Sequence, residues 1–134
     1  MEVIASYAGG VKFEVAARGH RVTCDQPAGN GGADSGMTPP EFLLASLATC
    51  AGFYAAQYLK TRKLPADGLR VSVTAEKALQ PARLALFRID VQTPELDPGH
   101  EAGLLRAVKA CLIHNTLAAP PAIEIAIAAP AAVI

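Results

Sequence analysis

Three cysteines are the side chains of this sequence best suited to chemistry: Cys24, Cys50 and Cys111. Three thiols at these spacings are too few and too scattered for a disulfide framework, so a cysteine with a task would be reactive or would bind a metal. The attacking species in thiol chemistry is the thiolate. A reactive cysteine therefore needs a nearby cation or hydrogen-bond donor that stabilises its negative charge.

Cys50 and Cys111 each lie on the apolar face of a predicted helix. A buried cysteine in such a place is most often a small apolar filler. Two packed helices could, however, bring the two sulfur atoms within disulfide reach. A position in the middle of a helix gains nothing from the helix dipole, so a cation or donor for Cys50 has to come from elsewhere. Tyr54 follows Cys50 by one helical turn and either lines the same pocket or packs in the core.

A zinc site is the alternative use of these residues. His20 and Cys24 lie four residues apart on one face of a predicted strand, and Cys111 and His114 have a chelating spacing. The four side chains would make a Cys2His2 set, but their spacings match no known zinc finger. We expect Cys24 to lie in the core, His114 to lie at a helix end, and the protein to hold no metal or other cofactor.

The strongest helix signal begins at Thr38-Pro39-Pro40-Glu41, which is a capping box with proline in the first turn. The helix is predicted to continue to about Lys60. Its middle, residues 42–56, is apolar all round, which predicts burial on every side. A chain of 134 residues has little material to surround such a helix, so we expect a second copy to contribute.

A second helix is predicted after Asp97-Pro98, with Asp97 as its N-cap. Its apolar stripe is formed by four residues at helical spacing: Leu104, Val108, Cys111 and Leu112. The segment His114-Asn115-Thr116 is expected to end it.

Alternating apolar residues predict strands elsewhere in the chain. Three lie within the first 24 residues, with Gly9-Gly10 as a hairpin turn, and a glycine-rich loop follows over residues 26–37, which is either disordered or functional. Two more strands surround residues 71–75 and 87–91, and a last one contains Ile123, Ile125 and Ile127. The order β-β-β-α-β-β-α-β predicts an α+β fold with antiparallel sheet, in a single domain over residues 1–134.

Charge and hydropathy exclude several functions. Twelve Lys and Arg balance twelve Asp and Glu, so the net charge is zero, whereas nucleic acids and anionic membranes bind basic surfaces. The apolar run 42–56 is too short to span a bilayer comfortably, and the N-terminus lacks the pattern of a signal peptide. These features predict a cytoplasmic protein. Its low content of charge favours self-association.

Two segments resemble one protein family. The run from Gly36 to Cys50, GMTPPEFLLASLATC, looks like the central helix of the osmotically inducible protein C (OsmC) and organic hydroperoxide resistance (Ohr) proteins. The run from Cys111 to Leu117, CLIHNTL, resembles the second cysteine motif of that family, with Leu112 where the family usually has proline. Both motifs occur in family order and at a family-like separation.

The resemblance implies an OsmC-like fold with long buried central helices, in an intertwined homodimer whose active sites lie between the subunits. It also implies that Cys50 is the peroxidatic thiolate and that Cys111 is the resolving thiol. The substrates would be organic hydroperoxides, the reductant an external dithiol that could carry a lipoyl group, and the role defence against oxidative stress. A second hypothesis is a dimeric OsmC-like protein that binds small molecules with little peroxidase turnover.

The sequence departs from the best-studied peroxidases of the family at two places. Their catalytic arginine in the first hairpin is absent after Gly9-Gly10, which leaves Lys12, Arg18 or Arg21 as the candidate cation. Glu41, the candidate catalytic glutamate, precedes Cys50 by nine positions. Nine positions place two side chains on opposite helix faces about 13 Å apart. Glu41 therefore acts across a dimer interface or through an intermediary, or it only caps the helix.

Overall fold

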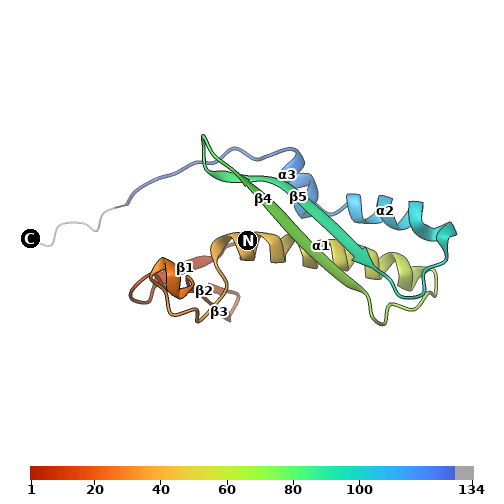
Figure 1. The fold of residues 1–134 in the computed structure, drawn as a ribbon, viewed down its shortest axis with the longest axis horizontal. Helices are drawn as coiled ribbons and strands as arrows, with labels where there is room; N and C mark the ends of the chain where they lie inside the picture. The colour runs from red at the N-terminus through yellow and green to blue at the C-terminus, as the bar shows by residue number, and fades with distance from the viewer. Residues whose placement is uncertain (129–134) are drawn as a thin grey trace, which may run out of the picture.

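The computed structural model describes residues 1–128 and shows a mixed fold with two antiparallel sheets (Figure 1). Its elements in chain order are the strands β1 (Ile4–Tyr7), β2 (Phe13–Ala17) and β3 (His20–Cys24), the 3-10 turn η1 (Ala28–Asn30), the helix α1 (Pro39–Thr61), the strands β4 (Arg70–Ala78) and β5 (Arg83–Gln92), the 3-10 turn η2 (Pro98–His100), and the helices α2 (Glu101–Lys109) and α3 (Leu112–Ala118). The predicted α+β class is confirmed.

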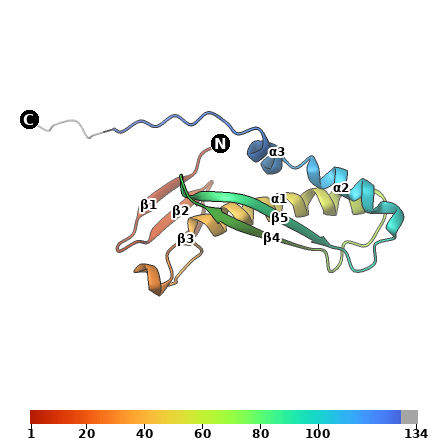
Figure 2. The same cartoon turned by 45° about the horizontal axis from the view of Figure 1, so that its top comes forward.

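The first three strands form one antiparallel sheet in the order β1-β2-β3. Gly9 and Gly10 make the first turn with φ angles of 98° and 55°, which only glycine adopts without strain. The predicted hairpin is therefore confirmed. This N-terminal sheet lies beside the N-terminal end of α1 and extends away from the remaining elements (Figures 1 and 2).

The glycine-rich loop between β3 and α1 is ordered around a buried carboxylate. Asp25 is 1% exposed and accepts hydrogen bonds from the N–H groups of Gln26, Ala33 and Ser35 and from the Ser35 hydroxyl. These bonds, those of Ser35 foremost, hold the pKa of Asp25 well below its usual range. Gly36 passes so close to β3 that a Cβ atom there would lie 2.0 Å from a backbone oxygen.

Helix α1 begins as predicted. The Thr38 hydroxyl accepts the N–H of Glu41, and the Glu41 carboxylate accepts the N–H of Thr38, so both halves of the capping box are present. The helix has 23 residues and is by length and composition alone able to cross a membrane, whereas the sequence expectation considered only the apolar run 42–56. The core helix of a soluble protein can have the same length and apolar composition. In this chain α1 packs on α2 and β4, as a core helix does.

One side of α1 forms the core with α2. The fully buried side chains here are Ala51, Ala55 and Leu59 on α1, which pack with Leu104 and Val108 of α2. Alanine at two successive turns of α1 lets the helices approach closely, because no long side chain stands between their backbones.

The hairpin β4–β5 covers another side of α1 (Figure 2). Its register pairs Val71 with Val91 and Val73 with Ile89, so the apolar residues that alternate in the sequence share one face of the sheet. Both predicted strands are confirmed, and both extend beyond the predicted residues.

The predicted burial of α1 on every side is not found in the single chain. Leu43 is 37% exposed and Phe53 is 62% exposed. The main contacts of α1 are with α2, α3 and the hairpin β4–β5, and the N-terminal sheet does not pack along the helix. A large apolar surface of α1 therefore stays uncovered.

The predicted second helix is two helices. α2 ends at Lys109, and Cys111 is the N-cap of α3, with an extended ψ angle of 131°. Leu104, Val108 and Cys111 are buried as expected, but Leu112 is 62% exposed. The change of direction at Ala110 and Cys111 ends the i, i+4 spacing on which the stripe was predicted, so Leu112 turns outward.

The last predicted strand is absent from residues 119–128. Ile123, Ile125 and Ile127 are 82%, 86% and 96% exposed, and their segment pairs with no strand within the described part of the chain. A strand needs a neighbouring edge to satisfy its backbone groups. The segment leaves the body of the molecule after α3 and reaches no such edge (Figure 1).

Candidate functional site

Cys50 lies half-way along α1, directly before Ala51, the first residue of the helix in the core shared with α2. Its side chain is half-buried. The hydroxyl groups of its helix neighbours Thr49 and Ser46 donate hydrogen bonds to backbone oxygens of the same helix. Cys50 is thus the residue of this segment whose polar atom is directed away from its own helix.

Cys111 lies at the junction of α2 and α3. Its side chain is fully buried, and its sulfur accepts the N–H of His114 at 3.5 Å, as an N-cap side chain does. Since α3 packs against α1, this junction places Cys111 next to the middle of α1.

The two thiols meet between these elements. Cys50 and Cys111 lie close enough for each to shift the pKa of the other, and both are free thiols. The sequence suggests that two packed helices could bring them together. In the structure the contact is made by α1 with the turn between α2 and α3.

The surroundings distinguish the two thiols. Burial works against a thiolate at Cys50, but hydrogen bonds from the Cys111 thiol and from the N–H groups of Ile113 and Leu112 outweigh it, and the pKa of Cys50 falls below its ordinary value. Burial and the neighbouring Cys50 both raise the pKa of Cys111. When the pair loses one proton, these surroundings therefore favour the negative charge on Cys50 over Cys111.

This arrangement can perform two-step thiol chemistry. A half-exposed sulfur with lowered pKa is a nucleophile for an electrophile that enters from outside. A protonated thiol in contact with it can then attack the oxidised sulfur and form a disulfide. Because both sulfur atoms are already adjacent, the second step needs no large movement of either helix.

The donors to Cys50 were not found by sequence reasoning. A mid-helix cysteine needs help from elsewhere, and the help comes from the backbone at the start of α3. The usual signal for a helix start is Ser, Thr, Asp or Asn at the N-cap. Cys111 occupies that position, so no standard signal marks the break.

Glu41 lies in the first turn of α1, far along the helix from the cysteine pair. Its carboxylate is exposed and is hydrogen-bonded to the backbone and the hydroxyl of Thr38. These bonds lower the pKa of Glu41. Within one chain Glu41 caps the helix, and a second role requires a group of another subunit.

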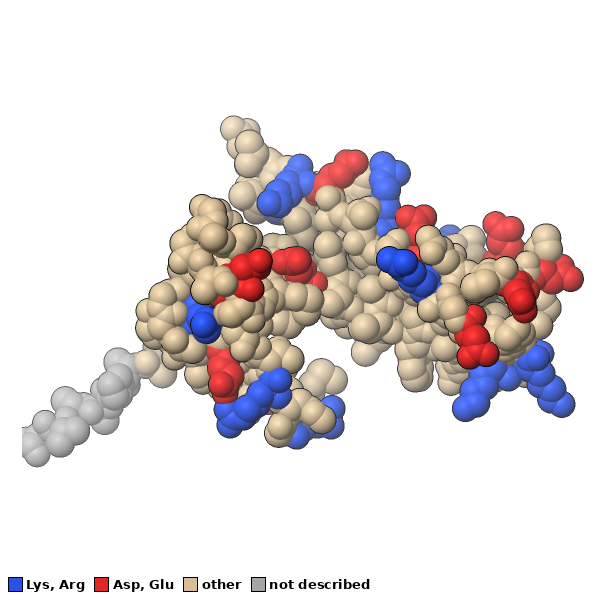
Figure 3. Space-filling model, turned by 60° about the horizontal axis from the view of Figure 1, so that its bottom comes forward, with Lys and Arg blue, Asp and Glu red and all other residues tan. Residues whose placement is uncertain are grey.

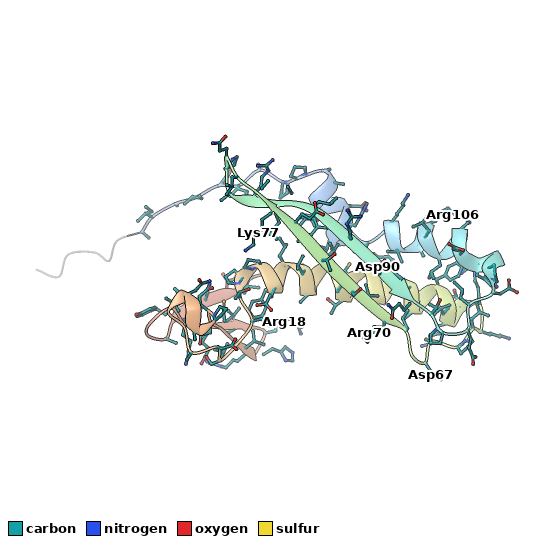
Figure 4. All side chains as sticks on the ribbon, viewed as in Figure 1. Arg18, Asp67, Arg70, Lys77, Asp90 and Arg106 are labelled. Carbon is teal, nitrogen blue, oxygen red and sulfur yellow. The ribbon has the colours of Figure 1, made fainter. Side chains whose placement is uncertain are left out.

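The three candidate cations belong to the N-terminal sheet and its turns. Arg18 is in the β2–β3 turn with a φ angle of 51°, and Arg21 forms an ion pair with Glu14. Figure 4 shows Arg18 beside the N-terminal sheet. Among the described residues, the groups that shift the pKa of Cys50 are thiol and backbone donors and include no charged side chain.

The four residues of the zinc alternative are not gathered in one place. Cys24 is buried in β3 beside Met37, as expected for a core residue, whereas Cys111 and His114 lie at α3. Over residues 1–128, no three His, Cys, Asp or Glu side chains are placed to hold a metal ion together. Tyr54 packs edge-to-face on Phe53.

An open apolar groove lies between the hairpin β4–β5 and the helices α2 and α3. Leu84 and Leu86 line it from the sheet, and Leu105 and Leu117 line it from the helices. Leu86 and Leu105 are 40% and 54% exposed. The groove is therefore a second apolar surface that the single chain leaves uncovered.

The molecule is an α+β dithiol protein. A long helix carries one thiol, a helix junction packed on it carries the other, and there are two antiparallel sheets. The family model for OsmC-like proteins matches residues 31–126, which contain both cysteines. The chain belongs to the OsmC-like protein family.

Solved structures show the same fold. An OsmC-like protein from Mycoplasma pneumoniae has a TM-score of 0.74 at 19% identity, over 89% of this chain and 87% of that one. Organic hydroperoxide resistance proteins from Elizabethkingia anophelis and Legionella pneumophila have TM-scores of 0.64 and 0.61 at 18% and 17% identity. The first match covers 87% of both chains, and the second covers 87% of this chain and 89% of the other. No curated protein matches the chain.

Proposed function

We propose that this protein is a thiol peroxidase that reduces organic hydroperoxides through Cys50 and Cys111. The observation that carries the proposal is the proximity of a half-buried thiol of lowered pKa to a buried thiol of raised pKa. Membership of the OsmC-like family and the names of two structural neighbours support it.

The first step forms a sulfur–oxygen bond and breaks the oxygen–oxygen bond of the peroxide. The Cys50 thiolate attacks the outer oxygen, which keeps its hydrogen, and Cys50 becomes a sulfenic acid. The leaving alkoxide takes a proton from solvent and becomes the alcohol. The N–H groups of Ile113 and Leu112 lower the pKa of Cys50, which favours the thiolate that attacks. Sulfur is oxidised by two electrons and the peroxide is reduced by two.

The second step joins the two sulfur atoms. The Cys111 thiol attacks the sulfenic acid, a disulfide forms, and water leaves with the Cys111 proton. An external dithiol then reduces the disulfide through a mixed disulfide and is itself oxidised. A lipoyl dithiol is the reductant that the family suggests. The apolar surroundings of Cys50 suit bulky apolar hydroperoxides. The proposed place of action is the cytoplasm.

The proposal includes a homodimer. Each chain of the dimer is proposed to be one domain. Three apolar surfaces are uncovered in the single chain: the part of α1 that carries Leu43 and Phe53, the groove beside β4–β5, and the segment 121–128. Charged side chains are scattered among uncharged ones over the face shown in Figure 3. The segment 121–128 lacks a sheet edge in its own chain, and a second chain can supply one. A partner subunit can also bring Lys12, Arg18, Arg21 or Glu41 to Cys50.

The dimer is tested by light scattering at micromolar concentration, where we expect the mass of two chains. Phe53→Asp should shift the protein toward monomer by at least about tenfold in dissociation constant, because burying an unpaired charge opposes association by more than ~1.4 kcal/mol. Leu79→Asp, in the exposed β4–β5 turn, is the matched control and should remain dimeric. A stable wild-type monomer would contradict the proposal.

A binding protein with little turnover is the second candidate function. The observation in its favour is that, among residues 1–128 of the same chain, no charged side chain stabilises the Cys50 thiolate. Such a protein would keep the fold and the apolar groove and would bind a small apolar molecule.

Thiol titration separates the two functions. One equivalent of cumene hydroperoxide should remove two of the three thiols per chain, because sulfenic acid formation and resolution each consume one. The third, Cys24, is buried in the N-terminal sheet and should remain. If all three thiols survive an hour with the peroxide, the binding function is favoured and the peroxidase is not.

A further inference from the structure

A small hollow outside the cysteine pair gathers two arginines. It has a volume of about 430 Å³ and lies between the C-terminal half of α1 and α2. Its lining residues are Tyr54, Gln57, Tyr58, Thr61, Arg62, Gly103, Arg106 and Ala107. They include two guanidinium groups and several hydrogen-bond donors, and none of them is acidic.

Arg62 is held at this hollow by the ring of Tyr58. Its guanidinium carbon lies 3.7 Å from the ring centroid, and its Nη1 donates to the backbone oxygen of Tyr58 at 3.4 Å and to the Thr61 hydroxyl at 3.3 Å. Stacking on an aromatic face restricts a guanidinium but leaves the N–H donors in its plane free. Within the described residues, Nη1 is the Arg62 nitrogen that makes hydrogen bonds, so its other donors are available.

The ring of Tyr58 is itself fixed from the other side. Its hydroxyl is hydrogen-bonded to Nδ1 of His100 at 3.0 Å, and the side chain is 8% exposed. Gly103 makes room for it, since a Cβ atom at that position would lie 2.4 Å from the hydroxyl. The fixed ring of Tyr58 therefore holds the guanidinium group of Arg62 in place at the hollow.

Arg106 lines the same hollow from α2, and Figure 4 labels it on that helix. The two ion pairs found in residues 1–128 are Arg21 with Glu14 and Arg88 with Glu76, so neither Arg62 nor Arg106 has a carboxylate partner there. Each arginine lies near the C-terminal end of its helix, where a cation is favourable. That effect explains one cation at each helix, but not why both line one hollow without an acidic residue.

We propose that this hollow is a binding site for a small organic anion with a carboxylate or phosphate group. Two guanidinium groups offer the paired donors that fit either oxyanion. The hydroxyl of Tyr54 and the amide of Gln57 can donate to it as well. The volume exceeds that of an inorganic ion, so the ligand carries an organic group.

The site is tested on the full-length protein by the arginine Nε–H signals in a nitrogen-15 spectrum. Inorganic phosphate and acetate are titrated separately, with sodium chloride added to keep the ionic strength constant. We expect saturable shifts of the Arg62 and Arg106 signals while Arg18 stays unchanged. The tighter of the two probes identifies the ligand group as phosphate or carboxylate. The protein has no tryptophan, so a parallel change in the fluorescence of Tyr54 and Tyr58 is readable.

Two substitutions give the decisive comparison. Arg62→Gln and Arg106→Gln should each weaken binding at least tenfold, and both are exposed positions where the fold should persist. Arg70→Gln, on β4 outside the hollow, is the matched control and should bind as the wild type does. Absence of saturable shifts with both probes would overturn the proposal, and so would binding that neither substitution weakens. The titrations contain no peroxide, so their outcome is independent of the peroxidase function.

Discussion

In the Cys111→Ser variant, peroxide is expected to react once with Cys50 and the cycle to stop there. Serine cannot form the disulfide, so the sulfenic acid persists. Dimedone should then label Cys50, and excess peroxide should convert it to the sulfinic acid. The wild type should show little dimedone adduct and a mass loss of about 2 Da for one disulfide.

The geometry makes this variant informative. Cys111 is the N-cap of α3 and accepts the N–H of His114, and serine is a good N-cap residue. Its hydroxyl can also donate to Cys50 in place of the thiol. The helix start and the support of the Cys50 thiolate should therefore persist while only the resolving sulfur is lost.

Cys24→Ser is the matched control for this experiment. Cys24 lies in the N-terminal sheet, beside Met37 and away from α1. Its variant should form the Cys50–Cys111 disulfide as the wild type does. If peptide mapping finds no such disulfide in the wild type after stoichiometric peroxide, the two-cysteine mechanism is wrong. Equal products from wild type and Cys111→Ser would assign Cys111 a structural role.

The second large effect is expected for Cys50→Ser, which should lower peroxide turnover with a dithiol reductant by at least about a thousandfold, as the loss of a catalytic nucleophile does in other enzymes. Serine has nearly the shape of cysteine, but its hydroxyl is not ionised at neutral pH. The N–H groups of Leu112 and Ile113 can still donate to it, so the fold should persist. Peroxide consumption and circular dichroism measure the two effects.

The pH dependence of the wild type gives this experiment a further readout. The Cys111 thiol and the N–H groups of Ile113 and Leu112 lower the pKa of Cys50 despite its burial. The rate should therefore rise with pH and reach half its maximum below the pKa of an ordinary thiol, because only the thiolate attacks. Turnover that survives in Cys50→Ser would remove this residue from the mechanism.

Elements with local signals could be predicted from the sequence. The glycine turn after β1, the capping box at Thr38 and Glu41, and the alternating residues of β4 and β5 depend on neighbours within a few positions. The motifs around Cys50 and Cys111 also lie within short segments, and they indicate the OsmC-like family to which the chain belongs. These features need no knowledge of distant contacts.

Other elements depend on contacts that no local pattern encodes. The apolar spacing continues across Ala110, yet the chain turns there and starts a new helix with a cysteine as N-cap. The isoleucines of the last predicted strand alternate correctly, but strand pairing needs an edge that the described chain does not place beside them. The burial of α1 was overestimated for the same reason, since an apolar helix is covered only where other elements reach it.

The sequence by itself determined the two thiols, the apolar segments that carry them and the local starts of those segments. Only the tertiary structure decided which thiol holds the charge. Thiolate stability depends on burial and on nearby donors, and the donors to Cys50 are N–H groups of Leu112 and Ile113, more than sixty positions away in the chain. Folding brings these groups together, and no spacing within the cysteine motifs specifies their distance.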